Sequence, residues 1–312
     1  MNPEPLLVSS ALLRHAEQRC RVRLAEDSDN PALLESLGEV LRKLGKLAEA
    51  APLYARLARM KPEDERLQYV HALIAGLDPM PLPPSGLQPG PFVTVNDFLP
   101  ASFHETLVPF TISMEGELTP AMVGNDQYAP DRRESLELRD ASEVQARFAK
   151  HVRQFLVEIS GRLHVPSFQL GRLEAKLRVY LDGHFFRLHM DNPSNSPTSC
   201  NRQISYVYFY HRMPRGYTGG DLLLFDTDLA ANQFTTSGFT RIQPVDNSIV
   251  FFPSGVYHSV VPVTCTSKRI ADSRFVINGH FSKVARAQAE VKSEERAPAE
   301  VVASVLRSFL VA

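Results

Sequence analysis

The sequence predicts an α+β protein in which a small helical unit precedes a larger β-rich domain. Residues 5–76 carry apolar side chains at helical spacing, the segment 78–91 holds six prolines, and eight short β-rich runs follow residue 173. A proline-rich segment cannot form a helix interior or a central strand, so residues 78–91 are expected to link the two parts. The 312 residues are enough for two domains.

Composition and charge favour a soluble globular protein that does not bind nucleic acid. The 34 basic residues are balanced by 35 acidic ones, and 44% of the chain is apolar. The cysteines Cys20, Cys200 and Cys265 form no CxxC pair, which indicates a reducing compartment without a disulfide framework. Neither a secretory signal nor an apolar run of ~20 residues is present. We therefore expect a cytoplasmic protein without a membrane span.

The sharpest helical pattern lies within residues 1–77 and has the spacing of a tetratricopeptide repeat. Gly38 and Ala50 would let two antiparallel helices approach closely, and Gly45 would turn the chain between them. One repeat cannot bury its own apolar face, so flanking helices are expected. This unit would be a docking surface for a partner or carrier protein, a cap packed on the main domain, or a dimerisation element. The pattern is carried by Leu37, Gly38, Leu41, Gly45, Leu47, Ala50, Tyr54, Leu57 and Pro62.

The first part of the main domain is expected to mix short elements with a long loop. A strand is predicted over 92–95 and a helix over 101–110. Residues 112–138 contain several glycines and prolines and are expected to form a loop. A loop of this length in a compact domain is usually functional or disordered. A capping-box pattern at Asp140–Glu143 introduces a long amphipathic helix over 141–163.

The second part of the main domain is predicted to be a β-sandwich or jelly roll. Turn signals such as Asp182-Gly183 and Asp246-Asn247 separate short β-rich runs at regular spacing. The domain would span 92–283, and residues 284–312 would add a C-terminal helix with one apolar stripe. The expected strands are 175–181, 184–191, 203–211, 220–226, 239–245, 248–253, 258–264 and 274–282.

A metal site is predicted around the segment that ends in His189-Met190-Asp191. On a strand, residues two apart share a face, so His189 and Asp191 would point the same way while Met190 packs behind them. His258 starts a later strand and is the candidate third ligand. Two histidines and one carboxylate on one face are the ligand set of non-haem Fe(II) oxygenases, which leaves coordination positions open.

A 2-oxoglutarate cosubstrate would also need a cation for its far carboxylate. A guanidinium can bind a carboxylate through two parallel hydrogen bonds. Arg274 begins the last predicted strand, and Arg269 lies nearer to His258. We prefer Arg274 because a side chain at the start of a strand can project into the mouth of a barrel, and we keep Arg269 as the rival.

Five segments add a family signal: YLDGHFFRLHMDNP, NRQISYVYFYH, GGDLLLFD, IVFFPSGVYHSVVPV and RFVINGHF. Through them, residues 92–282 resemble the prolyl 4-hydroxylase-like branch of the Fe(II)/2-oxoglutarate-dependent dioxygenases, and the oxygen-sensing prolyl hydroxylases in particular. The resemblance implies a double-stranded β-helix, which is a jelly roll. It says little about residues 1–91 or the C-terminal segment.

The resemblance assigns the main site residues and the cofactors. It implies that His189, Asp191 and His258 bind Fe(II) and that Arg274 anchors the C5 carboxylate of 2-oxoglutarate. The cosubstrates would be 2-oxoglutarate and O2, with ascorbate as an optional reductant. Hydroxylation of an unactivated C–H would be coupled to decarboxylation of 2-oxoglutarate to succinate and CO2.

The resemblance also covers the surroundings of the cosubstrate, with departures. Tyr180 is similar to a tyrosine that hydrogen-bonds 2-oxoglutarate, and Asn278 is similar to a polar position that faces it. A second cosubstrate tyrosine of the oxygen sensors falls on Phe209, so its role is not carried over. His280 stands where relatives often have tryptophan. The loop that contains Arg269 is longer than in relatives.

The expected substrate is a prolyl or other amino-acid side chain in a protein or peptide. The alternative is a free or carrier-tethered amino acid or another small metabolite. An open groove near 112–138 would favour peptides, and a lid there would favour small molecules. Two other classes of function are a non-catalytic adaptor built on the helical repeat and a Zn(II) hydrolase that uses the same three ligands. The intact ligand set argues against the adaptor, and the lack of a nucleophile or general-base motif argues against the hydrolase.

Overall fold

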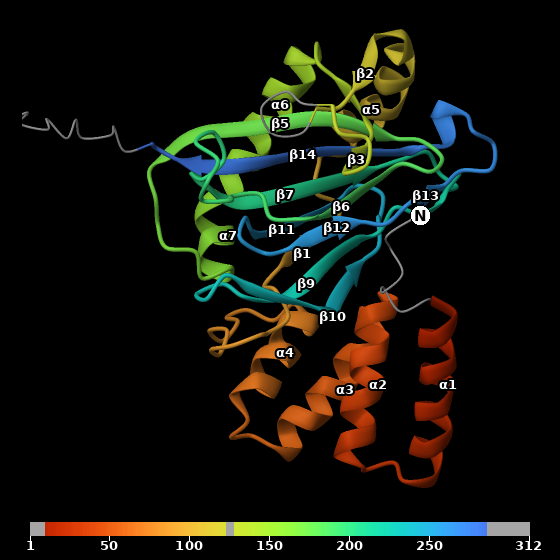
Figure 1. The fold of residues 1–312 in the computed structure, drawn as a ribbon, viewed down its shortest axis with the longest axis vertical. Helices are drawn as coiled ribbons and strands as arrows, with labels where there is room; N and C mark the ends of the chain where they lie inside the picture. The colour runs from red at the N-terminus through yellow and green to blue at the C-terminus, as the bar shows by residue number, and fades with distance from the viewer. Residues whose placement is uncertain (1–9, 123–127, 286–312) are drawn as a thin grey trace, which may run out of the picture.

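The computed structural model describes residues 10–122 and 128–285 and shows helices followed by a sheet-rich part (Figure 1). The α+β fold class is confirmed. The predicted C-terminal helix over 284–312 lies outside the described residues except for its first two positions. The helices of the N-terminal part are α1 (Ser10–Glu26), α2 (Pro31–Leu44), α3 (Leu47–Met60) and α4 (Glu65–Ala75).

The N-terminal helices are bounded by local capping chemistry. Asn30 precedes α2, and its Oδ1 accepts hydrogen bonds from the backbone N–H groups of Ala32 and Leu33. Gly45 ends α2 in the left-handed region at φ 74°, where glycine has no Cβ clash. As expected, Gly38 lets α2 and α3 approach closely, since a Cβ there would lie 3.0 Å from the ring of Tyr54.

The sheet-rich part consists of two main antiparallel sheets. The major sheet has the strand order β1-β11-β7-β14-β5-β4-β2, and the minor sheet has the order β10-β9-β12-β6-β3. A short ribbon pairs β8 with β13. Strands that are neighbours in a sheet are mostly not consecutive in the chain, so the chain passes back and forth between the two sheets, as in the predicted jelly roll. The strands are β1 (Val93–Val95), β2 (Leu118–Pro120), β3 (Arg133–Glu134), β4 (Leu136–Leu138), β5 (Leu170–Tyr180), β6 (Phe185–His189), β7 (Arg202–Tyr210), β8 (Thr218–Gly219), β9 (Leu222–Asp228), β10 (Gln233–Ile242), β11 (Ser248–Pro253), β12 (His258–Val260), β13 (Val263–Thr264) and β14 (Arg274–Lys283).

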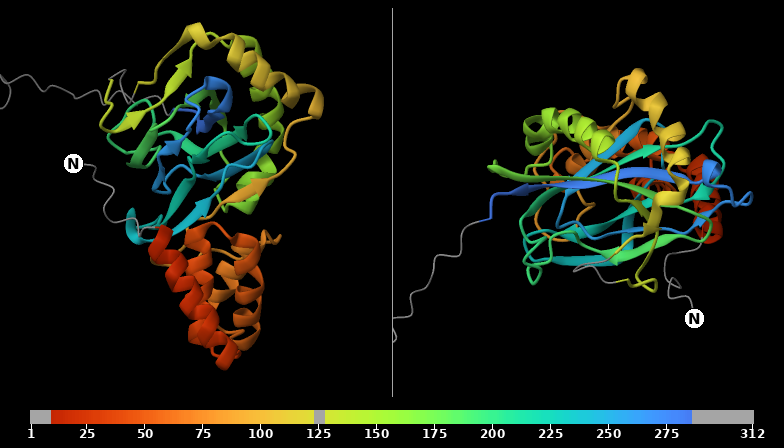
Figure 2. Two further views of the ribbon diagram at one scale, coloured as in Figure 1. Left: turned by 90° about the vertical axis from the view of Figure 1, so that its right-hand side faces the viewer. Right: turned by 90° about the horizontal axis from the view of Figure 1, so that it is seen from above.

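Helices cover the outer face of the major sheet (Figures 1 and 2). Phe103 from one helix and Phe148 from another join the same buried cluster as the strand residues Tyr206, Tyr208 and Phe251. Aromatic side chains of this size supply much of the apolar area that holds such layers together. These helices are α5 (Ala101–Ser113), α6 (Ser142–Val152) and α7 (Leu156–Arg162), with 3₁₀ turns η1 (Glu115–Glu117), η2 (Arg153–Phe155) and η3 (Ile270–Asp272).

The N-terminal helices pack on the minor sheet rather than standing apart from it. Arg42 on α2 is fully buried and donates two hydrogen bonds to Asp226 on β9, from Nη1 to Oδ1 at 2.7 Å and from Nη2 to Oδ2 at 3.0 Å. Arg42 also bonds Thr240 on β10 and Glu39 on its own helix. This packing fits the expectation of a helical cap, and a role in partner docking stays a prediction.

The proline-rich segment 78–91 has no regular secondary structure but is bound to both the helical part and the sheet-rich part. It contains no helix or strand, and Gln88 forms an isolated bridge to Thr227. The hydroxyl of Tyr69 on α4 donates to the carbonyl of Pro89. The segment therefore runs along the sheet-rich part.

In the part of the chain that the structure describes, no helix has the length and apolar character that a membrane span requires.

Three details of the predicted elements were wrong or incomplete. The loop over 112–138 contains β2, β3 and β4, whose two or three residues are too short to show a period. The helix over 141–163 is broken by the 3₁₀ turn η2. The capping box at Asp140–Glu143 does not form, because α6 begins after Ala141 without a side-chain cap. The eight predicted strands are present, with β8 and β13 as short separate pieces.

Candidate active site

Strand pairing brings the three predicted metal ligands together. His189 is the last residue of β6, and His258, the first residue of β12, lies opposite it in the antiparallel register. Asp191 follows two residues later, and its backbone N–H donates to the carbonyl of Ser254 at 3.0 Å. One ligand atom from each of His189, Asp191 and His258 lies within 4.8 Å of the others.

Hydrogen bonds set the tautomer of both histidines. Nδ1 of His189 lies 2.7 Å from the carbonyl oxygen of Arg187, and Nδ1 of His258 lies 2.9 Å from that of Val256. A carbonyl only accepts, so each Nδ1 carries the proton and each Nε2 keeps its lone pair. The two Nε2 atoms lie 3.6 and 3.4 Å from carboxylate oxygens of Asp191. Both imidazoles thus offer a metal the correct nitrogen.

The carboxylate of Asp191 is charged and held in place. Ser205 on β7 donates a hydrogen bond of 2.7 Å to Oδ2, and Nδ1 of His280 lies 3.7 Å from the same atom. Burial alone would raise the pKa of Asp191, but the neighbouring imidazoles of His280, His258 and His189 hold it well below its usual value. Burial and the neighbouring His189 lower the pKa of His258 to about 4. The ligand set is therefore ready to bind a cation at neutral pH.

The two candidate arginines differ sharply in their surroundings. Arg274 begins β14 opposite Tyr180, is only 1% exposed, and has no hydrogen-bond partner for Nε or Nη2 among the described residues. Its guanidinium lies over the rings of Tyr180 and Phe209, 4.6 and 5.3 Å from their centroids. The side chain of Arg269 is 65% exposed and bound to Asp272.

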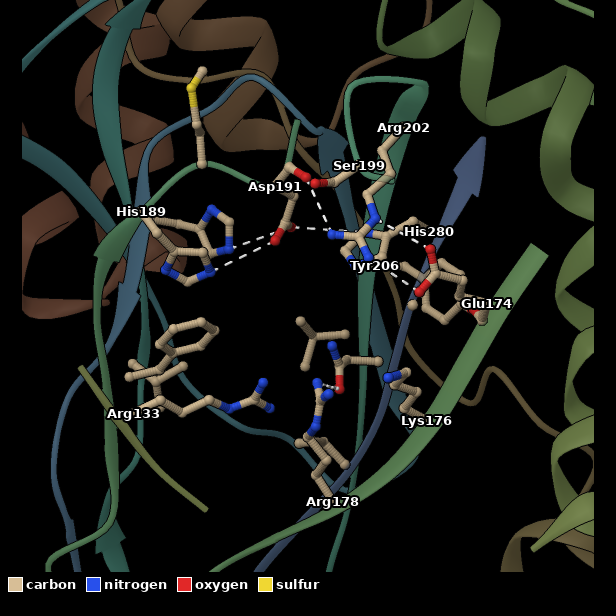
Figure 3. A pocket seen from close by; sticks show the side chains of 18 of the residues that line it. Arg133, Glu174, Lys176, Arg178, His189, Asp191, Ser199, Arg202, Tyr206 and His280 are labelled. Atoms are coloured by element: carbon tan, nitrogen blue, oxygen red, sulfur yellow. Dashed lines mark hydrogen bonds and ion pairs between the residues drawn. The ribbon is translucent and has the colours of Figure 1, made fainter. Parts of the chain in front are cut away.

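One cavity of about 500 Å³ is lined by all the predicted site residues except Arg269. Figure 3 shows His189 and Asp191 at one end and the basic side chains of Arg133, Arg178 and Lys176 toward the other. The predicted residues in the cavity wall are Tyr180, His189, Asp191, His258, Arg274 and Asn278.

Tyr180 and Asn278 are both engaged by basic side chains in this cavity. Burial alone would raise the pKa of Tyr180, but the charges of Arg133 and Arg274 outweigh it and lower that pKa. The side-chain oxygen of Asn278 accepts a hydrogen bond of 2.8 Å from Nη1 of Arg178. Neither side chain points away from the pocket.

Sequence reasoning missed several residues of the site. Arg133, Arg178 and Arg202 line the cavity, and Ser205 holds Asp191 from behind. Arg133 lies on a two-residue strand inside a stretch that reads as a loop. Arg178 could have been found, because it lies two residues before Tyr180 on β5 and side chains two apart share a face of a strand.

The residues present fit Fe(II) and 2-oxoglutarate. The histidine nitrogens and the carboxylate oxygen lie close together in the wall of the cavity. Three protein ligands beside an open cavity suit a metal ion that must keep coordination positions free. The unpartnered nitrogens of Arg274 in the same cavity suit the far carboxylate of a dicarboxylate.

Comparison with known proteins finds similarity over the part of the chain that holds the site. Residues 175–282 match the model of the 2OG-Fe(II) oxygenase superfamily. A PKHD-type hydroxylase of Synechocystis sp. that is described as uncharacterised is 38% identical over 141 residues, which are 45% of this chain and 46% of that protein. The match thus spans about half the length of this curated relative.

Solved prolyl hydroxylases are among the similar structures. A prolyl-4-hydroxylase of Pseudomonas putida has 22% identity and a TM-score of 0.46 and covers 63% of this chain and 94% of its own. A prolyl hydroxylase of Trichoplax adhaerens, solved with a peptide fragment of hypoxia inducible factor, has 16% identity and a TM-score of 0.48 and covers 72% and 93%. The segment that holds the metal ligands and Arg274 thus matches the 2OG-Fe(II) oxygenase superfamily in sequence, and its ligand set fits that match.

Proposed function

We propose that this protein is an Fe(II)- and 2-oxoglutarate-dependent hydroxylase that acts on an amino-acid side chain of a peptide or protein, with proline as the first candidate. The observation that carries the proposal is the pairing, in one cavity, of a His-Asp-His ligand set with a buried guanidinium that has unpartnered nitrogens. In this role, His189, Asp191 and His258 hold the iron, and Arg274 holds the C5 carboxylate of 2-oxoglutarate. When bound, iron and 2-oxoglutarate supply the O2-derived oxidant that attacks a C–H bond.

The protein's own residues orient the reactants and limit access of water. Phe186 stacks on His189 with the ring centroids 3.7 Å apart, and Phe252 packs edge-on against His258. These apolar faces fix the imidazole planes. Tyr180 and Asn278 line the space between the metal ligands and Arg274 and would position the cosubstrate by hydrogen bonding.

The ligand assignment is tested by His189→Ala, with the exposed His15→Ala as the control. We expect the wild type and the control to retain Fe(II) after anaerobic purification and to release succinate from 2-oxoglutarate, because both keep the ligand set. His189→Ala should lose both properties without losing its fold. Iron retention and succinate release by His189→Ala would contradict the assignment, as would a wild type that binds no iron.

The choice between the two arginines is tested by a matched pair of substitutions. Arg274→Gln removes a buried charge that would face the cosubstrate carboxylate, so the KM for 2-oxoglutarate should rise by at least about 100-fold. Arg269→Gln changes the net charge equally at an exposed site and should leave this KM within about twofold. The reverse result would assign the anchor to Arg269.

A peptide substrate is favoured by a second hollow that lies beside the first. It also has a volume of about 500 Å³ and shares Met122, Glu174 and Lys176 with the main cavity. Its remaining wall includes Glu137 and Arg139 from the region of β4. An extended chain with one residue at the metal ligands would have a path along β5.

The substrate class is tested by incubating cell extract with the wild type and with Arg274→Gln. Mass spectrometry should find peptides that gain one oxygen atom only with the wild type. If the wild type instead adds oxygen to small molecules and to no peptide, the small-metabolite alternative replaces the peptide.

A further inference from the structure

Arg133 is a second buried cation in the cavity, and its charge is not matched. Its side chain is 4% exposed, its Nε donates to Ser135 Oγ at 3.0 Å, and its Nη2 has no partner among the described residues. Its guanidinium lies 4.6 Å from the centroid of the Phe186 ring. Figure 3 shows it extending into the pocket from the side opposite Arg178. Within the described part of the cavity wall, the side chains with unpartnered buried nitrogens are Arg133 and Arg274.

Three other basic side chains of the pocket, Arg178, Lys176 and Arg202, have acidic partners. Arg178 donates two hydrogen bonds to Glu137, which also lies 3.4 Å from Lys176. Arg202 donates two to Glu174. These carboxylates are therefore already committed, and none of them bonds Arg133 directly.

The proposed cosubstrate does not neutralise Arg133 either. One carboxylate of 2-oxoglutarate would face Arg274, and the other would join Asp191 in offsetting the charge of the metal. Burial and the neighbouring Arg178 lower the pKa of Arg133 to about 10, so this side chain is still protonated at neutral pH. A buried, charged group without a partner is costly, and the pocket offers Arg133 no carboxylate of its own among the described residues.

We infer that the substrate brings a carboxylate to Arg133, so that the enzyme selects a peptide with an acidic side chain or a free C-terminus near the residue that is hydroxylated. The inference rests on the proposed function. A carboxylate would give Arg133 the acidic partner that Arg178, Lys176 and Arg202 already have. The unpartnered Nη2 of Arg133 would donate to it, and the positive charge of Arg178 would add attraction from the opposite wall.

The test measures binding of matched peptides to the complex of the protein with Mn(II) and 2-oxoglutarate by calorimetry. Three pairs differ only by a carboxylate in place of an amide: acetyl-Pro and its amide, acetyl-Glu-Pro-amide and acetyl-Gln-Pro-amide, and acetyl-Pro-Glu-amide and acetyl-Pro-Gln-amide. The first pair reports a free C-terminus, and the other two report an acidic side chain on either side of proline.

We expect the acid of at least one pair to bind at least about tenfold more tightly than its amide. Arg133→Gln should abolish this preference and Arg133→Lys should keep part of it, while the Kd for 2-oxoglutarate changes less than about twofold. Arg23→Gln, an exposed change of equal charge on α1 that lines neither hollow, should behave like the wild type.

Several outcomes would overturn the inference. Equal or undetectable binding of acid and amide in every pair would do so, provided that 2-oxoglutarate binds. A large loss of 2-oxoglutarate affinity in Arg133→Gln would assign Arg133 to the cosubstrate instead. If Arg133 only braced the sheet, Arg133→Gln would lower Tm and weaken acid and amide equally. A wild type that binds no 2-oxoglutarate would contradict the proposed function itself, and the inference with it.

Discussion

At the scale of single residues, Asp191 depends on one hydroxyl group for its orientation. Ser205 donates to Asp191 Oδ2 and also lies within hydrogen-bond distance of Ser254 and His280. Partners of this kind, one step behind the metal ligands, fix the direction of the ligand and raise metal affinity. The geometry of the candidate metal site thus extends to a neighbouring strand.

Ser205→Ala should therefore weaken Fe(II) or Mn(II) binding by about 10-fold, in the range seen when such partners are removed. The measurement is an anaerobic metal titration. Ser248→Ala is the matched control, because Ser248 is also a buried strand serine but bonds the carbonyl of Val245. Unchanged affinity in Ser205→Ala would show that the hydroxyl does not orient the ligand.

Residue chemistry explains which parts of the site the sequence could predict. The spacing of His189 and Asp191 predicted that the two side chains lie together, although β6 ends at His189 and Asp191 follows it in a loop. Arg274 could be preferred because it begins a strand. The roles of Arg133 and Ser205 could not be foreseen. Arg133 lies in a strand too short to show a period, and Ser205 acts through a contact between strands that only the folded sheets create.

At the scale of elements, the attachment of α2 to the minor sheet depends on a buried ion pair. Arg42 and Asp226 are 184 residues apart in the chain, and each appears in the sequence as an ordinary charged residue. Apolar periodicity predicted the helices and strands themselves. It could not predict this contact, because nothing local distinguishes a buried charge pair from two exposed charges.

Arg42→Met should lower the free energy of unfolding by about 3–5 kcal/mol, because it leaves Asp226 buried without its partner. The double variant with Asp226→Leu should recover most of the loss. Arg66→Met is the control, since its pair with Glu35 is about one-third exposed on both sides and should cost less than about 1 kcal/mol. Urea unfolding measures all three, and a small effect of Arg42→Met alone would contradict the proposed attachment.

At the scale of the whole molecule, two buried histidines make stability depend on pH. Burial lowers the pKa of both His258 and His280 to about 4, from the usual value of 6.5. Between these values, the unfolded chain binds protons that the folded chain does not. The free energy of unfolding therefore falls as pH decreases through this window.

For the metal-free protein, we expect a loss of up to about 1.4 kcal/mol per pH unit from each histidine between about pH 6.5 and pH 4. Urea unfolding in the presence of a chelator at several pH values measures this slope. His280→Gln should make the slope shallower, because one of the two groups is gone. A flat profile between about pH 6.5 and pH 5 would show that the two side chains are not buried in neutral form.

The strand β9 carries both of the connections described above. Leu224 lies opposite His258 in the sheet, and Asp226, two residues further on, binds Arg42 of α2. A metal bound at His258 stabilises the folded state by its binding free energy, and β9 belongs to the same folded unit as α2. Iron supply would then govern how long the entire chain, including helices far from the pocket, survives proteases in the cell.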